Sequence, residues 1–128
     1  MTMAEVEKDI LTDLEELGDP ISRYSFFIEC AKECKTLPEE YRTDDYKIKE
    51  CQVNTWAVLC KDNDRCHFYA DSEALLVKGA LTLLQEIYEN RTEEETSSYK
   101  CGLLNEEAFI SVFTPKQRKG LEEILFLF

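Results

Sequence analysis

The stretch Thr55–Ala70, TWAVLCKDNDRCHFYA, sets the fold class of this chain. Its two ends, Thr55–Cys60 and Cys66–Ala70, carry β-branched and aromatic side chains, which favour β-strands. The polar residues 61–65 between them include Asp-Asn-Asp, a composition typical of a turn. The stretch is therefore predicted to form an antiparallel hairpin.

A third strand is predicted immediately upstream of this hairpin. Tyr46 and Ile48 alternate with Lys47 and Lys49, which is the two-residue period of a strand. Short links between successive strands favour a three-stranded antiparallel meander. Cys51 then falls on the connection between the first two strands.

The segments on either side of the strands show helical periodicity and clear start and stop signals. Gly18 is expected to end a first helix, and Asp19-Pro20 to start a second. Asp71-Ser72 is expected to cap a long apolar helix that reaches Tyr88, and Thr114-Pro115-Lys116-Gln117 to start the last helix. We therefore predict a single domain over residues 1–128, of α+β class, with helices packed on one face of a small sheet.

Composition and charge exclude several classes of partner. The chain has 128 residues, of which 44% are hydrophobic, so a core is available without metal or disulfide support. Lys and Arg number 15 and Asp and Glu 27, giving a net charge of −12, which disfavours nucleic acid and anionic membranes. No stretch has the pattern of a signal peptide or a membrane span, and a cytoplasmic location is expected.

Most catalytic templates have no counterpart in the sequence. Its four glycines are scattered, so there is no glycine-rich phosphate loop, and its one histidine, His67, excludes multi-histidine metal sites. The cysteines are the remaining candidates, and a reducing compartment predicts free thiols. They are Cys30, Cys34, Cys51, Cys60, Cys66 and Cys101.

Two groups of cysteines raise the possibility of a metal site. Cys60, Cys66 and His67 lie on the two sides of the predicted hairpin and would need one more thiol to complete a zinc site. Cys30 and Cys34 are one helical turn apart and lack two further ligands, so ordinary packing is the simpler interpretation. A cysteine- and histidine-based metal module remains one alternative function.

Cys51 differs from the other cysteines because a loop can present it to a partner. A free thiol with a pKa of about 8.5 is only slightly ionised near neutrality, so chemistry at Cys51 requires activation or a partner that completes the site. The alternative is an ordinary loop cysteine.

Three blocks of sequence resemble the SufE family of sulfur acceptors. Ile48–Trp56, IKECQVNTW, is similar to the family block V/I-x-G-C-x-S-x-x-W. Ala70–Gly79, ADSEALLVKG, resembles A/G-D-S-D-A-x-I-V-K-G, and Thr114–Glu122, TPKQRKGLE, resembles the closing L-T/S-x-x-R-x-x-G-L. Order and spacing agree from about Tyr24 to the last helix.

The resemblance implies a SufE/NifU-like fold and a sulfur-shuttle function. Cys51 would accept persulfide sulfur from a SufS-like, PLP-dependent cysteine desulfurase and pass it to an iron–sulfur scaffold. The chain would need no cofactor of its own and would be an accessory to the desulfurase. The resemblance also implies an apolar cavity for the Cys51 side chain, with Trp56 and the central helix as candidate walls.

The same resemblance suggests supporting roles for other residues. Asp71 and Lys78 are expected to cap and flank the central helix, and Arg118 to hold the loop or meet the partner. Apart from the resemblance, Trp56 is expected to be a core residue.

Two residues depart from the family pattern next to the cysteine. Glu50 replaces a family glycine, and Val53 replaces a serine. A carboxylate beside Cys51 is expected to raise its pKa, and loss of glycine restricts the loop. These departures keep open a second alternative, a non-catalytic interaction subunit of a desulfurase.

Overall fold

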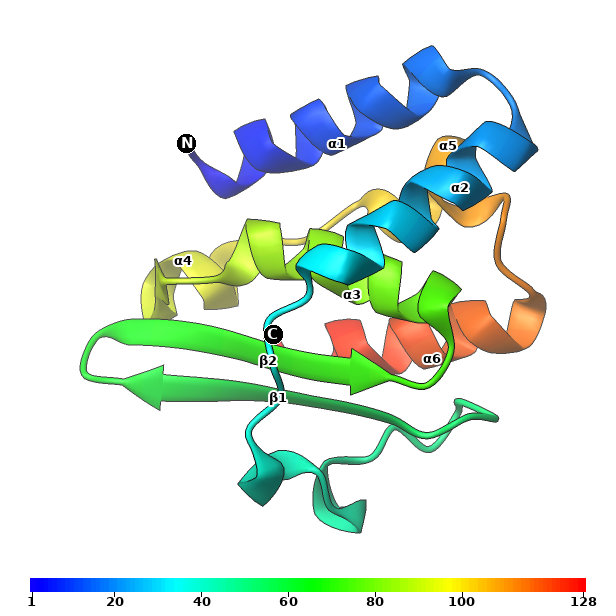
Figure 1. The fold of residues 1–128 in the computed structure, drawn as a ribbon. Coiled ribbons are helices and arrows are strands. Elements are labelled where there is room, and N and C mark those ends of the chain that lie inside the picture. The colour runs from blue at the N-terminus through cyan, green and yellow to red at the C-terminus, as the bar shows by residue number, and fades with distance from the viewer.

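The computed structural model describes residues 1–128 and has the α+β architecture that the sequence predicts, with helices on one face of a three-stranded antiparallel sheet (Figure 1). The strands are β1 (Thr55–Asp62), β2 (Arg65–Ser72) and β3 (Arg91–Thr92), in the spatial order β1-β2-β3. The predicted fold class is therefore confirmed.

The hairpin of β1 and β2 forms where the sequence predicts it. Its register runs from Thr55 opposite Ser72 to Asp62 opposite Arg65. Asn63, in the two-residue turn, adopts a left-handed backbone with φ of 58°, which asparagine tolerates better than most residues.

The predicted strand at residues 46–49 is wrong, because this segment makes only one isolated bridge, between Lys47 and Trp56. A 3-10 helix, Asp44–Tyr46, precedes the bridge. After the bridge, the chain forms a loop before it enters β1. The apparent alternation reflects one buried anchor, Ile48. The third strand is instead β3, whose two residues are too few to give a recognisable pattern.

The helical signals mark the elements closely. Gly18 ends the first helix with φ of 76°, Asp19 caps the second, and Thr114 forms a capping box with Gln117. The α-helices are α1 (Met3–Leu17), α2 (Pro20–Cys30), α3 (Leu75–Tyr88), α4 (Glu93–Ser98), α5 (Glu107–Ile110) and α6 (Pro115–Leu125). Other 3-10 turns cover Ala31–Glu33, Glu39–Tyr41 and Leu103–Asn105. No helix combines the length and apolarity that crossing a bilayer requires.

Helix α3 is the centre of the core and is buried over most of its surface. It approaches α2 so closely that a Cβ at Gly79 would lie 2.0 Å from the Phe27 carbonyl oxygen. The predicted cap at residues 71 and 72 is wrong, because both residues belong to β2 and the N-cap is Ala74. The Ser72 hydroxyl instead accepts a hydrogen bond from the Ala74 amide in the strand-to-helix turn.

The other face of the sheet is covered by the chain between α2 and β1, which crosses the hairpin in Figure 1. Thr55 and Ala57 are buried toward the helices, so the alternation of the strand turns Trp56 to this outer face. There the Arg42 guanidinium lies 4.8 Å from the centre of the indole ring. Trp56 is thus not part of the helix-side core.

Candidate functional site

Cys51 lies on a loop of residues 49–54 whose two ends are held together. The Ile48 amide donates a hydrogen bond of 2.8 Å to the Thr55 carbonyl, and Lys47 bridges Trp56. Thr55 is itself buried, and its hydroxyl hydrogen-bonds the Ser72 hydroxyl at 2.8 Å. The loop therefore projects from a firm base at the start of the hairpin.

Two glutamates hold the loop in place, Glu123 on α6 and Glu73 in the turn between β2 and α3. The amides of Lys49 and Glu50 donate to the Glu123 carboxylate of α6, at 3.1 and 2.9 Å. At the other end, the Asn54 amide donates to a Glu73 carboxylate oxygen at 3.2 Å, and the Glu73 amide donates to the Asn54 carbonyl at 3.0 Å. Backbone groups that a loop normally leaves to water are thereby satisfied by protein.

The Cys51 thiol packs directly against α6. A Cβ placed on Gly120 would lie 2.3 Å from Cys51 Sγ, closer than any real contact of this kind. Gly120 is buried, and Cys51 is half-buried. The missing side chain of Gly120 therefore creates the space in which the thiol sits.

A cavity of about 140 Å³ opens beside Cys51, between the loop, the start of α3 and the start of α6. Its walls are Cys51, Gln52, Val53, Ala74, Val77, Thr114, Lys116 and Gln117. The central helix thus contributes as predicted, through Ala74 and Val77, whereas Trp56 does not line the cavity.

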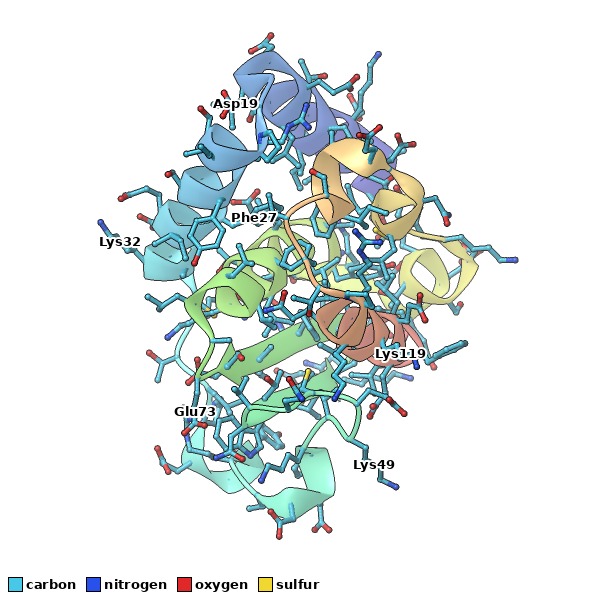
Figure 2. All side chains as sticks on the ribbon, turned by 90° about the vertical axis from the view of Figure 1, so that its right-hand side faces the viewer. Asp19, Phe27, Lys32, Lys49, Glu73 and Lys119 are labelled. Carbon is cyan, nitrogen blue, oxygen red and sulfur yellow. The ribbon has the colours of Figure 1, made fainter.

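Charged side chains flank the loop on the face shown in Figure 2. Lys49 of the loop and Lys119 of α6 lie on the same side of the molecule, and both are exposed. Glu73 lies on the other side of the loop in this view. The surroundings of Cys51 thus carry both charge signs in a chain that is strongly acidic as a whole.

The environment of Cys51 raises the pKa of its thiol. Burial is the main cause, and the carboxylates of Glu123 and Glu50 add to it, while Thr55 acts in the opposite direction. The predicted direction of the Glu50 effect agrees with this, but Glu123 is the larger charge effect. The thiol is therefore held protonated at neutral pH while the loop is in this position.

The predicted supporting residues Asp71 and Lys78 lie away from the cavity. Asp71, on the outer face of β2, pairs with Arg42 at 2.8 Å and with Lys78 at 3.1 Å. This network ties the segment before β1 to the central helix. Its role is structural support of the hairpin, which replaces the predicted helix capping.

Arg118 does not line the cavity, and its buried Nε has no hydrogen-bond partner. Its neighbour Gln117 faces the cavity while closing the capping box of α6 with Thr114. From this end of α6, Thr114, Lys116 and Gln117 line the cavity. The closing block of the resemblance therefore lies beside the cavity, and a role of Arg118 in holding the loop or meeting the partner stays a prediction.

The alternative metal site does not assemble. Cys60 and His67 are cross-strand partners on the outer face, but Cys66 is buried on the helix face. His67 Nδ1 instead lies 3.1 Å from a Glu89 oxygen. No group of three or more His, Cys, Asp or Glu side chains is arranged to hold a metal ion.

The remaining cysteines are also free thiols. Burial is the largest cause that raises the pKa of Cys30 to about 11 and that of Cys101 to about 12. Burial raises the pKa of Cys34 as well, and its thiol lies 3.5 Å from the Ala70 carbonyl. None of these three lines the cavity beside Cys51.

Sequence reasoning missed Glu123 and the function of Gly120. Glu123 lies in an ordinary acidic stretch of a helix and has no local signal that marks it. Gly120 belongs to the closing block of the resemblance, and a glycine inside a helix is a signal of close approach. That signal identifies Gly120 as important without naming the side chain that approaches it.

Sequence comparisons place this chain among known proteins. Residues 8–127 match the model of the SufE family, described as an Fe-S metabolism associated domain. The cysteine desulfuration protein SufE of Wigglesworthia glossinidia brevipalpis is 27% identical over 104 residues, which are 80% of this chain and 72% of that protein. The sulfur acceptor protein CsdE of Escherichia coli K12 is 25% identical over 104 residues, 80% of this chain and 71% of that protein.

A solved structure shares the fold. The solution structure of a hypothetical protein from Thermus thermophilus superposes with a TM-score of 0.72, at 22% sequence identity. The match covers 94% of this chain and 88% of that one.

Proposed function

This chain belongs to the SufE family, and on that premise we propose that it is a sulfur acceptor in iron–sulfur metabolism, with Cys51 as the accepting thiol. The donor is a PLP-dependent, SufS-like cysteine desulfurase, and the recipient is an iron–sulfur scaffold. Residues 1–128 act as one domain in this role, in the cytoplasm, where reducing conditions favour free thiols. The PLP belongs to the donor.

The observation that carries this proposal is the placement of Cys51. It is the one cysteine on the cavity between the loop, α3 and α6. A thiol at this position is partly shielded from bulk solvent, yet it is carried on a loop that a partner can displace.

The transfer is a thiol–disulfide-type exchange. The Cys51 thiolate attacks the outer sulfur of the persulfide on the desulfurase, the sulfur–sulfur bond breaks, and the desulfurase thiolate leaves. Cys51 then carries the sulfur as a persulfide, and no oxidant or reductant is consumed. Because the resting thiol is protonated, the loop must move or the partner must accept the proton before attack.

The cavity suits the product of this step. Its volume of about 140 Å³ leaves room beside Sγ for one more sulfur atom, and Val53, Ala74 and Val77 provide an apolar lining. A partly enclosed setting with apolar walls slows attack on the persulfide by other thiols and by oxidants. The same cavity would therefore shelter the sulfur between the donor and the scaffold.

The test is intact-mass analysis after incubation with a cysteine desulfurase, PLP and cysteine. We expect the mass of added sulfur on the unsubstituted chain, located at Cys51 by peptide mapping, and none on Cys51→Ser. Cys60→Ser is the matched control, since Cys60 is a half-buried free thiol away from the cavity. Normal sulfur uptake by Cys51→Ser would refute the assignment.

A non-catalytic interaction subunit is the second candidate, because Glu50 and Glu123 both disfavour the thiolate of Cys51. It predicts that Cys51→Ser changes desulfurase turnover no more than Cys60→Ser does. Stimulation that depends on Cys51 favours the acceptor function.

A further inference from the structure

Glu123 makes an unusual contact for a glutamate on the surface of a helix. Both of its carboxylate oxygens accept backbone N–H groups, one from Lys49 and one from Glu50, and these belong to the two residues that precede Cys51. The partners are more than 70 residues apart in sequence, with separations of 74 and 73. A side chain that receives two successive amides fixes both the position and the direction of that backbone.

Glu123 and Gly120 lie one helical turn apart, on the same side of α6. Glu123 receives the amides of the loop, and Gly120 leaves the space for the thiol that follows them. Helix α6 thus contacts the loop in two ways: Glu123 binds its backbone amides, and Gly120 leaves space for the thiol.

We propose that Glu123 is a latch, a positioning residue that holds the loop of residues 49–54 against α6 and keeps the Cys51 thiol turned inward against Gly120. The part of this inference that concerns sulfur transfer rests on the proposed function; the part that concerns the loop does not.

The latch has a defined consequence for reactivity. While it is closed, Cys51 is packed on Gly120 and has the Glu123 carboxylate close by. When it opens, the thiol leaves both the packed position and the carboxylate, so it becomes more accessible and ionises more easily. A desulfurase that opens the latch on docking would therefore activate the thiol only at the moment of transfer.

The experiment compares Glu123→Gln with Glu122→Gln. Both substitutions remove one negative charge from α6, but Glu122 is exposed and makes no hydrogen bond to the loop amides. The neutral amide that Glu123→Gln introduces offers one oxygen in place of two and places an NH2 group toward the other N–H. Two quantities are measured without any partner: hydrogen exchange of the amides of residues 49 and 50, and the rate of Cys51 alkylation by iodoacetamide.

We expect Glu123→Gln to speed exchange at residues 49 and 50 roughly tenfold and to accelerate Cys51 alkylation several-fold, as expected from the loss of charge-assisted hydrogen bonds. Exchange within the β1–β2 ladder should stay the same. A general loss of stability would speed exchange there as well. Glu123→Asp keeps the charge on a shorter side chain. Its exchange and alkylation rates should fall between those of Glu123→Gln and those of the unsubstituted protein. Glu122→Gln should match the unsubstituted protein in both measurements.

Sulfur uptake is then measured against desulfurase concentration. Glu123→Gln should reach half-maximal uptake at a lower concentration with an unchanged maximal rate, because a bound partner opens the latch in either protein. Unchanged exchange and alkylation in Glu123→Gln would overturn the latch. Faster exchange and alkylation with no sulfur uptake by any variant would leave the latch standing and would refute the proposed function instead.

Discussion

Replacing Gly120 by alanine tests the packing of Cys51 most directly. The new Cβ would lie 2.3 Å from Cys51 Sγ, whereas non-bonded atoms of this size settle at about 3.5–4.0 Å. The thiol would have to move by more than about 1 Å, and its shortest way out is rotation away from α6. We therefore expect Gly120→Ala to expose the thiol.

The free energy of unfolding should respond to two opposing effects. Overpacking costs about 1–3 kcal/mol. Alanine inside a helix is more favourable than glycine by about 1 kcal/mol. Gly120→Ala should therefore be close to neutral or destabilising by up to about 2 kcal/mol.

A Cys51→Ala background should reverse the sign of this effect. Once the sulfur is gone, the nearest atoms to the new Cβ are Cys51 Cβ at 3.7 Å and Cα at 3.8 Å, which are ordinary contacts. Gly120→Ala should then stabilise the fold by up to about 1 kcal/mol, so the two sites should be coupled by about 1–3 kcal/mol.

The assay is urea unfolding of the four proteins in this double-mutant cycle, combined with the rate of Cys51 alkylation followed by peptide mass spectrometry. We expect faster alkylation of Cys51 in Gly120→Ala than in the unsubstituted protein. The same change in unfolding free energy in both backgrounds, together with an unchanged alkylation rate, would show that Gly120 does not seat the thiol.

Three further predictions concern other parts of the molecule. Glu50→Gln should raise the alkylation rate of Cys51 by roughly twofold at low salt and by less at high salt, since exposed charges are screened; equal rates at low salt would contradict this. Gly79→Ala should destabilise the fold by at least about 3 kcal/mol in thermal or urea unfolding, because its Cβ would lie 2.0 Å from the Phe27 carbonyl oxygen. Burial opposes ionisation of Asp71, but hydrogen bonds from its basic partners prevail and hold the pKa of its carboxyl below the usual value. Its contribution to stability is therefore present above the unfolded pKa of about 3.9 and is lost as the pH falls through the lower, folded value, so Asp71→Asn should show a weaker loss of stability in acid.

The features that depend on neighbours a few residues away could be predicted from the sequence. The hairpin follows from two strand-forming runs around a polar turn. Gly18, Asp19 and Thr114 mark helix ends because caps form with backbone groups two or three residues along the chain. The family blocks also located the candidate thiol, Cys51, and the elements that surround it.

Where the sequence pattern misled, the cause was a pattern too short to separate two structures. Four alternating residues at 46–49 fit a strand. An irregular segment with one buried residue, Ile48, has the same sequence pattern. The two residues of β3 carry no period at all, and their pairing depends on where α3 returns the chain to β2. Trp56 looks like a core residue by type, yet the register of β1 turns it to the outer face.

The surroundings of Cys51 follow from tertiary packing and could not be predicted from the sequence. Whether Glu123 or Glu122 meets the loop depends on the rotation of α6 about its axis, which is set by the packing of Leu121 and Ile124 into the core. The contact of Gly120 with Sγ likewise requires α6 and the loop to meet across about 70 residues of intervening chain. Such contacts depend on the balance of packing over the whole core, and no local stretch of sequence encodes that balance.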